Sequence, residues 1–169
     1  MYKIEKVNEY NVKDYMYVNF KSWKESYVGI VNQDFLDKLD NNIDEKIQNQ
    51  INIIKQEKEL NQRYILYVDD KPLGMVRYGK SRQEEYQNDG ELCAIYLLND
   101  VKKKGYGKIL FNFAVDNLKK EGYKKMIIGC LKGNPTNDFY KYMGAKEVFR
   151  KNLTIGEDEY EEIFYLLEI

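Results

Sequence analysis

The stretch AIYLLNDVKKKGYGKIL, residues 94–110, constrains the fold of this chain more than any other feature. An unbroken apolar run gives way to a polar turn, three lysines, two glycines separated by one residue, and the start of a helical pattern. Continuous apolar strands are typical of positions covered on both faces of a sheet. The stretch therefore predicts a buried strand, a basic glycine loop and a helix, in that order.

Apolar periodicity elsewhere in the chain predicts further sheet and helix segments on both sides of this unit. The expected strands are 2–7, 63–68, 73–79, 91–98, 124–131, 146–155 and 161–169, with a turn at 69–72. The expected helices are 12–27, 36–54 with a possible break at 40–42, 109–120 and 135–143. This order predicts an α/β (α+β) fold, in which a mixed sheet of about seven strands carries helices on both faces.

The bulk composition limits the classes of function. With 169 residues and 43% hydrophobic content, the chain is expected to form one ordered domain over residues 1–169. A net charge of −1 and a pI near 5.7 disfavour nucleic acid or an anionic membrane as partners. There is no apolar run of membrane-spanning length, and the first ten residues lack a signal-peptide pattern, so a cytoplasmic protein is expected.

The chain has no histidine, and this absence limits its chemistry. It excludes Ser-His-Asp and Cys-His catalysis and removes the commonest transition-metal ligand. Cys93 and Cys130 both lie in apolar runs and are interpreted as small buried hydrophobic residues, so no metal site is expected. Proton transfer must therefore come from carboxylates, tyrosine, lysine, cysteine, backbone groups or water.

The glycine loop can bind an anion. A helix N-terminus presents unpaired N–H groups and a partial positive charge, and glycines before it let a phosphate approach the backbone. Neither G-x-x-x-x-G-K-[ST] nor G-x-G-x-x-G fits this loop, since Leu110 stands where the second motif needs its third glycine. The loop is thus predicted to hold a pyrophosphate, with a solvated lysine turn as the alternative.

This loop resembles the acetyl-CoA signature [Q/R]-x-x-G-x-[G/A] of the GNAT superfamily of N-acyltransferases. Lys102, Gly105 and Gly107 occupy its three defining positions, with lysine in place of arginine or glutamine. The preceding strand is similar to the family's Leu-Tyr-Val-x-Pro, with IYL at 95–97 and Asn99 in place of proline. In that family the fourth and fifth strands are splayed, which would leave the backbone at 95–97 free to bind the pantetheine arm.

Two further segments extend the resemblance. NPTNDFYKYMG at 134–144 is similar to the family's N-x-x-x-x-[F]-Y-x-x-x-G. SWKESYVGI at 22–30 is similar to the S-W-x-x-x-Y-x-G-i stretch of a bacterial, mostly uncharacterised branch. The resemblance implies a GNAT fold with a twisted, mostly antiparallel sheet. It also implies that acetyl-CoA is bound by Ile95, Tyr96, Leu97, Lys102, Lys103, Lys104, Gly105, Tyr106, Gly107, Lys108, Asn134 and Tyr140.

The implied activity is transfer of an acetyl group from acetyl-CoA to a primary amine, directly, in a ternary complex. Tyr140 would be the general acid that protonates the departing thiolate, and Glu91 the base that accepts the proton of the amine through water. Trp23 and Tyr27 lie one helical turn apart and could form a wall of the acceptor pocket. The alternatives are packing aromatics for the three ring residues and a solvated strand end for Glu91.

Two other functions stay open at this point. One is a non-catalytic acyl-CoA-binding sensor on the same fold, and the other, disfavoured by the acidic pI, is a nucleic-acid module. The acceptor could be a small-molecule amine or an amine of a peptide or protein, and a homodimer is possible. Acidic residues at 84–91 favour a cationic amine, unless they form a solvated loop.

Overall fold

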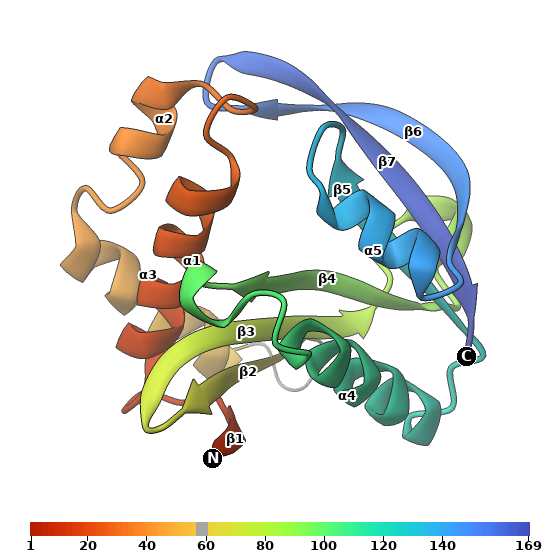
Figure 1. The fold of residues 1–169 in the computed structure, drawn as a ribbon, viewed down its shortest axis with the longest axis horizontal. Coiled ribbons are helices and arrows are strands. Elements are labelled where there is room, and N and C mark those ends of the chain that lie inside the picture. The colour runs from red at the N-terminus through yellow and green to blue at the C-terminus, as the bar shows by residue number, and fades with distance from the viewer. Residues whose placement is uncertain (57–60) are drawn as a thin grey trace.

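The computed structural model describes residues 1–56 and 61–169. Figure 1 shows these residues as a twisted sheet with helices packed against it. The elements are β1 (Tyr2–Lys6), α1 (Val12–Ser26), α2 (Gln33–Asp37), α3 (Ile43–Gln56), β2 (Asn61–Val68), β3 (Lys71–Lys80), β4 (Gly90–Leu97), α4 (Tyr106–Lys120), β5 (Lys125–Leu131), α5 (Thr136–Tyr142), β6 (Lys146–Ile155) and β7 (Asp158–Glu168), with short 3-10 helices at Glu84–Tyr86 and Asn99–Val101.

Within the described residues, seven strands form one sheet in the order β1-β2-β3-β4-β5-β7-β6. Strands β4 and β5 are parallel, and the other neighbouring strands pair antiparallel. Strands β4 and β5 are parallel because α4 carries the chain back to the end of the sheet where β4 began, so that β5 runs in the same direction. The predicted mixed, mostly antiparallel sheet of about seven strands is therefore confirmed.

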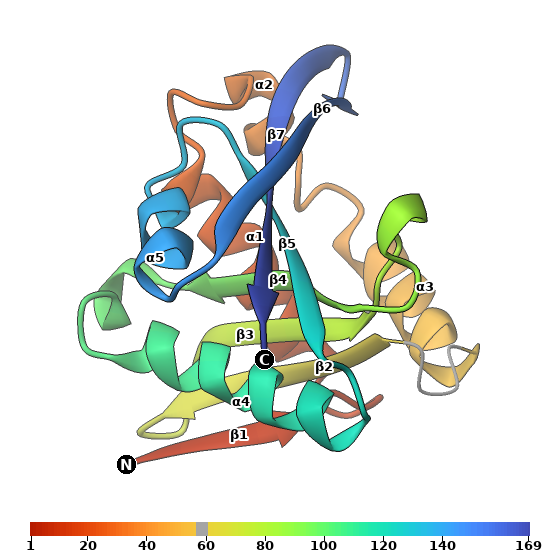
Figure 2. The same ribbon diagram turned by 90° about the vertical axis from the view of Figure 1, so that its right-hand side faces the viewer.

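Helices cover both faces of the sheet, as predicted. Helices α1 and α3 pack on one face, where Val18, Ile65 and Met75 are buried in a shared core. Helix α4 packs on the other face, which it covers with Leu110, Ala114 and Leu118 at helical spacing. Figure 2 shows that β5 and β7 rise at a steep angle from the plane of β1 to β4, with α5 beside them.

The turns are tighter than the sequence predicts. Asp69 and Asp70 take φ values of 48° and 60°, the two left-handed positions of a two-residue hairpin turn, so β3 begins at Lys71 and not at residue 73. The last hairpin also closes over two residues, 156–157, where a five-residue turn was expected. The predicted break between the second and third helices is confirmed, and Asn42 turns the chain there with a φ of 54°.

Among the described residues, no helix combines the length and the apolar character needed to cross a membrane.

Candidate active site

The sheet opens between β4 and β5, and this opening organises the site. The two strands pair at Gly90, Glu91 and Leu92 and then separate. From Ala94 to Leu97, β4 pairs with β3 but has no strand partner on the β5 side among the described residues. Its backbone groups along that edge are available for an extended ligand that adds to the sheet as another strand would.

A β-bulge at Cys93 contributes to this opening. In the pairing with β3, Tyr78 lies opposite Leu92 and Arg77 lies opposite Ala94, so Cys93 has no counterpart. A bulge of this kind bends the strand and increases its twist. It also resets the alternation of side chains, since Leu92 lies in the core under α4 whereas Ala94 packs against the core under α1.

The glycine loop lies at the start of α4, beyond the carboxyl end of β4. Gly105 is the N-cap residue with a φ of 88°, and no side chain caps the helix. The first turn carries no acidic residue, so the positive end of the helix is not neutralised within it. A Cβ at Gly105 would meet no atom within 4 Å, and one at Gly107 would approach Leu97 at 3.6 Å and Phe139 at 3.9 Å. The backbone N–H groups in this cradle, at the start of α4, are therefore open to an anion.

The lysines around the cradle differ in their surroundings. Lys103, Lys104 and Lys108 are exposed, as a mobile positive rim would be. Lys102 is half-buried, and its Nζ donates to Ser26 Oγ at the end of α1 over 3.1 Å. The ammonium of Lys102 is therefore fixed by a contact that the sequence did not indicate.

Buried polar side chains join the end of α1 to the loop before α5. Asn134 Nδ2 donates to the Tyr27 hydroxyl over 3.2 Å, and Asn134 Oδ1 accepts from the backbone N–H of Thr136 over 2.9 Å. Tyr27, Tyr96 and Tyr140 lie close enough to interact electrostatically. Burial raises the pKa of Tyr96 to about 12 and raises the pKa of Tyr27. These phenols are consequently neutral at physiological pH.

Tyr140 is held by packing. The residue is 4% exposed, and its ring lies among those of Phe111, Phe139 and Tyr165, with centroids 6.4, 5.7 and 6.3 Å away. In the described part of the chain, no side chain or backbone group hydrogen-bonds its hydroxyl. Burial raises the pKa of Tyr140 well above its usual value. The side chain is thus a fixed, neutral phenol close to Tyr96 of β4 and Cys130 of β5.

Glu91 is buried, with 2% of its surface exposed, so the alternative of a solvated strand end is wrong. Its carboxylate accepts from the backbone N–H of Arg82 over 2.7 Å and from Arg82 Nη2 over 2.6 Å. It lies on the part of β4 that is still paired with β5. Its nearby acidic neighbours, Glu84 and Glu85, are exposed.

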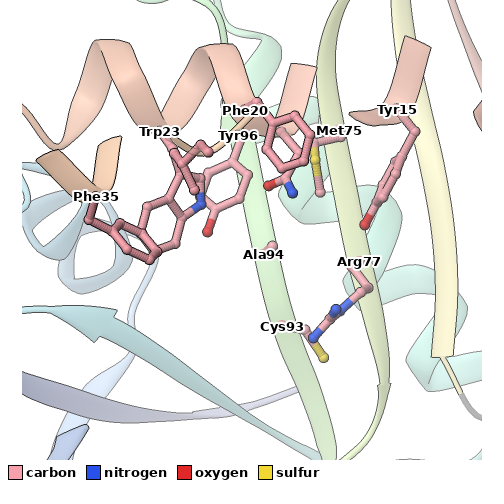
Figure 3. Close-up of a pocket in the computed structure, with 11 residues that line it drawn as sticks. Tyr15, Phe20, Trp23, Phe35, Met75, Arg77, Cys93, Ala94 and Tyr96 are labelled. Atoms are coloured by element: carbon pink, nitrogen blue, oxygen red, sulfur yellow. The ribbon is translucent and has the colours of Figure 1, made fainter. Parts of the chain in front are cut away.

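A cavity of about 320 Å³ lies between α1, α2 and the strands β3 and β4 (Figure 3). It contains Trp23, one of the two residues predicted to wall an acceptor pocket. Tyr27 is not among the lining residues and instead lies in the core near Leu131 and Ile155. The cavity is lined by Tyr15, Asn19, Phe20, Trp23, Phe35, Leu39, Met75, Arg77, Cys93, Ala94 and Tyr96.

Sequence reasoning missed Tyr15, Asn19 and Arg77. The only signal for Arg77 was a charged residue inside an otherwise apolar strand, MVRYG. Cys130 is buried, as predicted, whereas Cys93 is half-buried and lines the cavity, so the prediction is wrong for Cys93. Burial raises the pKa of the Cys130 thiol to about 12 and also raises that of Cys93, which leaves both thiols protonated and weakly nucleophilic.

Comparisons with known proteins agree with this architecture. The model of the acetyltransferase (GNAT) family matches residues 18–145. The uncharacterized N-acetyltransferase YuaI of Bacillus subtilis is 25% identical over 156 residues, which cover 90% of this chain and 85% of that protein.

Two solved structures share the fold. The PaiA N-acetyltransferase of Thermoplasma acidophilum, in complex with coenzyme A, has a TM-score of 0.76 at 19% identity, and the match covers 100% of this chain and 99% of that one. An acetyltransferase of Thermus thermophilus has a TM-score of 0.73 at 14% identity, with 100% and 97% coverage.

Proposed function

Since the chain belongs to the acetyltransferase (GNAT) family, we propose that it transfers an acetyl group from acetyl-CoA directly to a primary amine in a ternary complex. The observation that carries this proposal is the opening between β4 and β5. The glycine turn follows β4 and leads into α4, the aromatic cavity adjoins β4 on the face toward α1, and Tyr140 lies close to Tyr96 of β4. Acetyl-CoA on the free edge of β4 and an amine in the cavity beside β4 can therefore approach each other.

Acetyl-CoA would lie along the free edge of β4. Its pyrophosphate would accept from the backbone N–H groups at Gly105, Tyr106 and Gly107, with the lysines supplying further positive charge. Its pantetheine arm would pair with the backbone at 95–97, and an N–H there would polarise the thioester carbonyl. The open cradle and the unpaired strand edge support this position.

We expect acetyl-CoA to stabilise the protein against heat, because it would bind the folded chain and not the unfolded one. At a hundredfold excess over the dissociation constant the gain is ~2.7 kcal/mol, which a thermal melt detects readily. Pantetheine is the control, since it lacks the pyrophosphate for the cradle. An unchanged melting temperature with millimolar CoA and acetyl-CoA would contradict the proposal.

The chemistry needs two proton transfers. The amine nitrogen attacks the thioester carbon, the new C–N bond forms, and the C–S bond breaks. Tyr140 would donate its phenolic proton to the departing thiolate. Glu91, which lies two residues before Cys93 of the cavity wall on β4, would accept the proton that the amine loses, through intervening water. The neutral phenol of Tyr140 and the burial of Glu91 support these roles.

We expect Glu91→Gln to lower turnover at neutral pH by ~10²-fold, the lower end of the range for a general base. Glutamine keeps the shape and one acceptor oxygen for the two Arg82 donors, but it cannot take up the proton. The rate should recover as the pH rises, because the amine is then deprotonated before it binds. The matched control is Glu84→Gln in the exposed loop, and equal rates for both variants at neutral pH would remove Glu91 as the base.

The alternative is an acyl-CoA sensor without turnover. The cavity beside Tyr96 favours the enzyme, because a sensor needs no acceptor pocket. A thiol-release assay with acetyl-CoA and a broad panel of amines separates the two. CoA binding without release for any amine would support the sensor.

A further inference from the structure

The cavity carries one kind of charge. Of its described lining residues, Arg77 alone is charged, and none has a carboxylate. The acidic loop at 82–91 contributes no residue to this lining, although its sequence suggested attraction for a cationic amine. A positively charged acceptor would therefore meet a like charge inside the cavity.

Arg77 has no counter-charge within the described part of the chain. No carboxylate there forms an ion pair with it, and its buried Nε has no hydrogen-bond partner. The groups beside its guanidinium are Tyr15 and Cys93, whose pKa values are both raised by burial, so that neither is an anion at neutral pH. Figure 3 shows the guanidinium next to the sulfur of Cys93. A donor that is partly desolvated and unpaired costs free energy unless a ligand completes it.

The other lining residues indicate the chemical character of the part of the ligand that does not contact Arg77. Phe20, Trp23, Phe35, Leu39 and Met75 give the cavity apolar walls. A single guanidinium in such surroundings suits a monoanion better than a dianion, since a second charge would be buried without compensation. The planar guanidinium also matches a carboxylate, which it can bind through two parallel hydrogen bonds.

We propose that the acceptor is an amino acid with an apolar side chain, and that Arg77 binds its carboxylate while the aromatic walls hold the side chain. This inference rests on the proposed function and specifies its substrate class. Arg77 is then a specificity-determining residue that contacts the substrate, and it leaves the transfer chemistry to other groups.

The test compares leucine with leucinamide and with 3-methylbutylamine, which keep the amine and side chain but lose the anion. Values of kcat/KM are expressed per free amine, because the amide lowers the pKa of the amine. We expect the parent protein to prefer leucine by roughly 10- to 100-fold, the range for one hydrogen-bonded charge. Arg77→Gln should abolish the preference by raising KM for leucine, with little change in kcat for leucinamide.

The matched control is Arg150→Gln, which removes an exposed arginine on β6 that pairs with Glu147 and Glu161. It should keep the preference. Equal kcat/KM for leucine and leucinamide in the parent, or a preference that survives in Arg77→Gln, would overturn the inference while leaving acetyl transfer intact. Faster acetylation of O-phosphoethanolamine than of leucine would assign the site to a phosphate instead and also overturn it.

If no amine turns over, equilibrium binding decides separately. N-acetyl-leucine should bind the CoA-loaded protein more tightly than N-acetyl-leucinamide, and only when Arg77 is present. Equal binding of the two, or binding of neither, would overturn the inference about the substrate. The thiol-release assay tests acetyl transfer itself, so the two outcomes can be told apart.

Discussion

Tyr140→Phe should lower the rate of acetyl transfer by ~10²-fold or more while acetyl-CoA affinity and folding are retained. Phenylalanine fills the same space among Phe111, Phe139 and Tyr165, so the packing of α5 is preserved. No hydrogen bond of the hydroxyl within the described residues is lost. What disappears is the proton that the thiolate would receive. Single-turnover rates should be measured, because slow product release can hide a chemical defect in the steady state.

The same helix offers the control. Tyr142 lies two residues further along α5 and is 79% exposed, so Tyr142→Phe removes a phenol that cannot reach the opening. Its rate should equal that of the parent. Full activity in Tyr140→Phe would remove Tyr140 as the general acid. Because burial raises its pKa well above the usual value, Tyr140 stays protonated as the pH rises, and we expect no loss of activity from its ionisation up to about pH 10.

Gly105→Val should abolish measurable acetyl-CoA binding, a loss of ~10²-fold or more in affinity if one phosphate can no longer approach the helix amides. The position has open space around it, so the new side chain would occupy the cradle itself. Valine also strains the backbone, since left-handed φ values cost ~1–2 kcal/mol for a residue with a Cβ. Isothermal titration with acetyl-CoA measures the affinity, and a thermal melt measures the strain.

Gly122 at the other end of α4 separates the two effects. It has a φ of 94° and, like Gly105, no atom within 4 Å of the place that a Cβ would occupy. Gly122→Val should therefore show a similar loss of stability with unchanged acetyl-CoA affinity. Gly107→Val adds a variant without left-handed strain, whose side chain would enter the space between Leu97 and Phe139. Normal affinity in both cradle variants would show that phosphate does not bind there.

The sequence by itself determined those features whose cause is local. The order of strands and helices follows from apolar periodicity within each segment, and the crossover through α4 makes β4 and β5 parallel. The glycine turn is local as well, because Gly105 is the N-cap of α4 and Gly107 lies in its first turn. Adjacent residues carry the information about such a turn, so seven letters of sequence predict it, and its role in binding phosphate stays a prediction.

Only the tertiary structure decided how the segments meet. The bulge at Cys93 depends on the register of two strands, and the separation of β4 from β5 depends on the twist of the whole sheet. The ion pair of Glu91 with Arg82 and the hydrogen bond between Asn134 and Tyr27 each join residues of different segments. The packing also leaves Arg77 Nε buried without a hydrogen-bond partner among the described residues. Burial and electrostatic environment are sums over such neighbours. A residue type can therefore indicate that a group could ionise, bind or donate a proton, whereas the packing of distant segments decides which one faces a ligand.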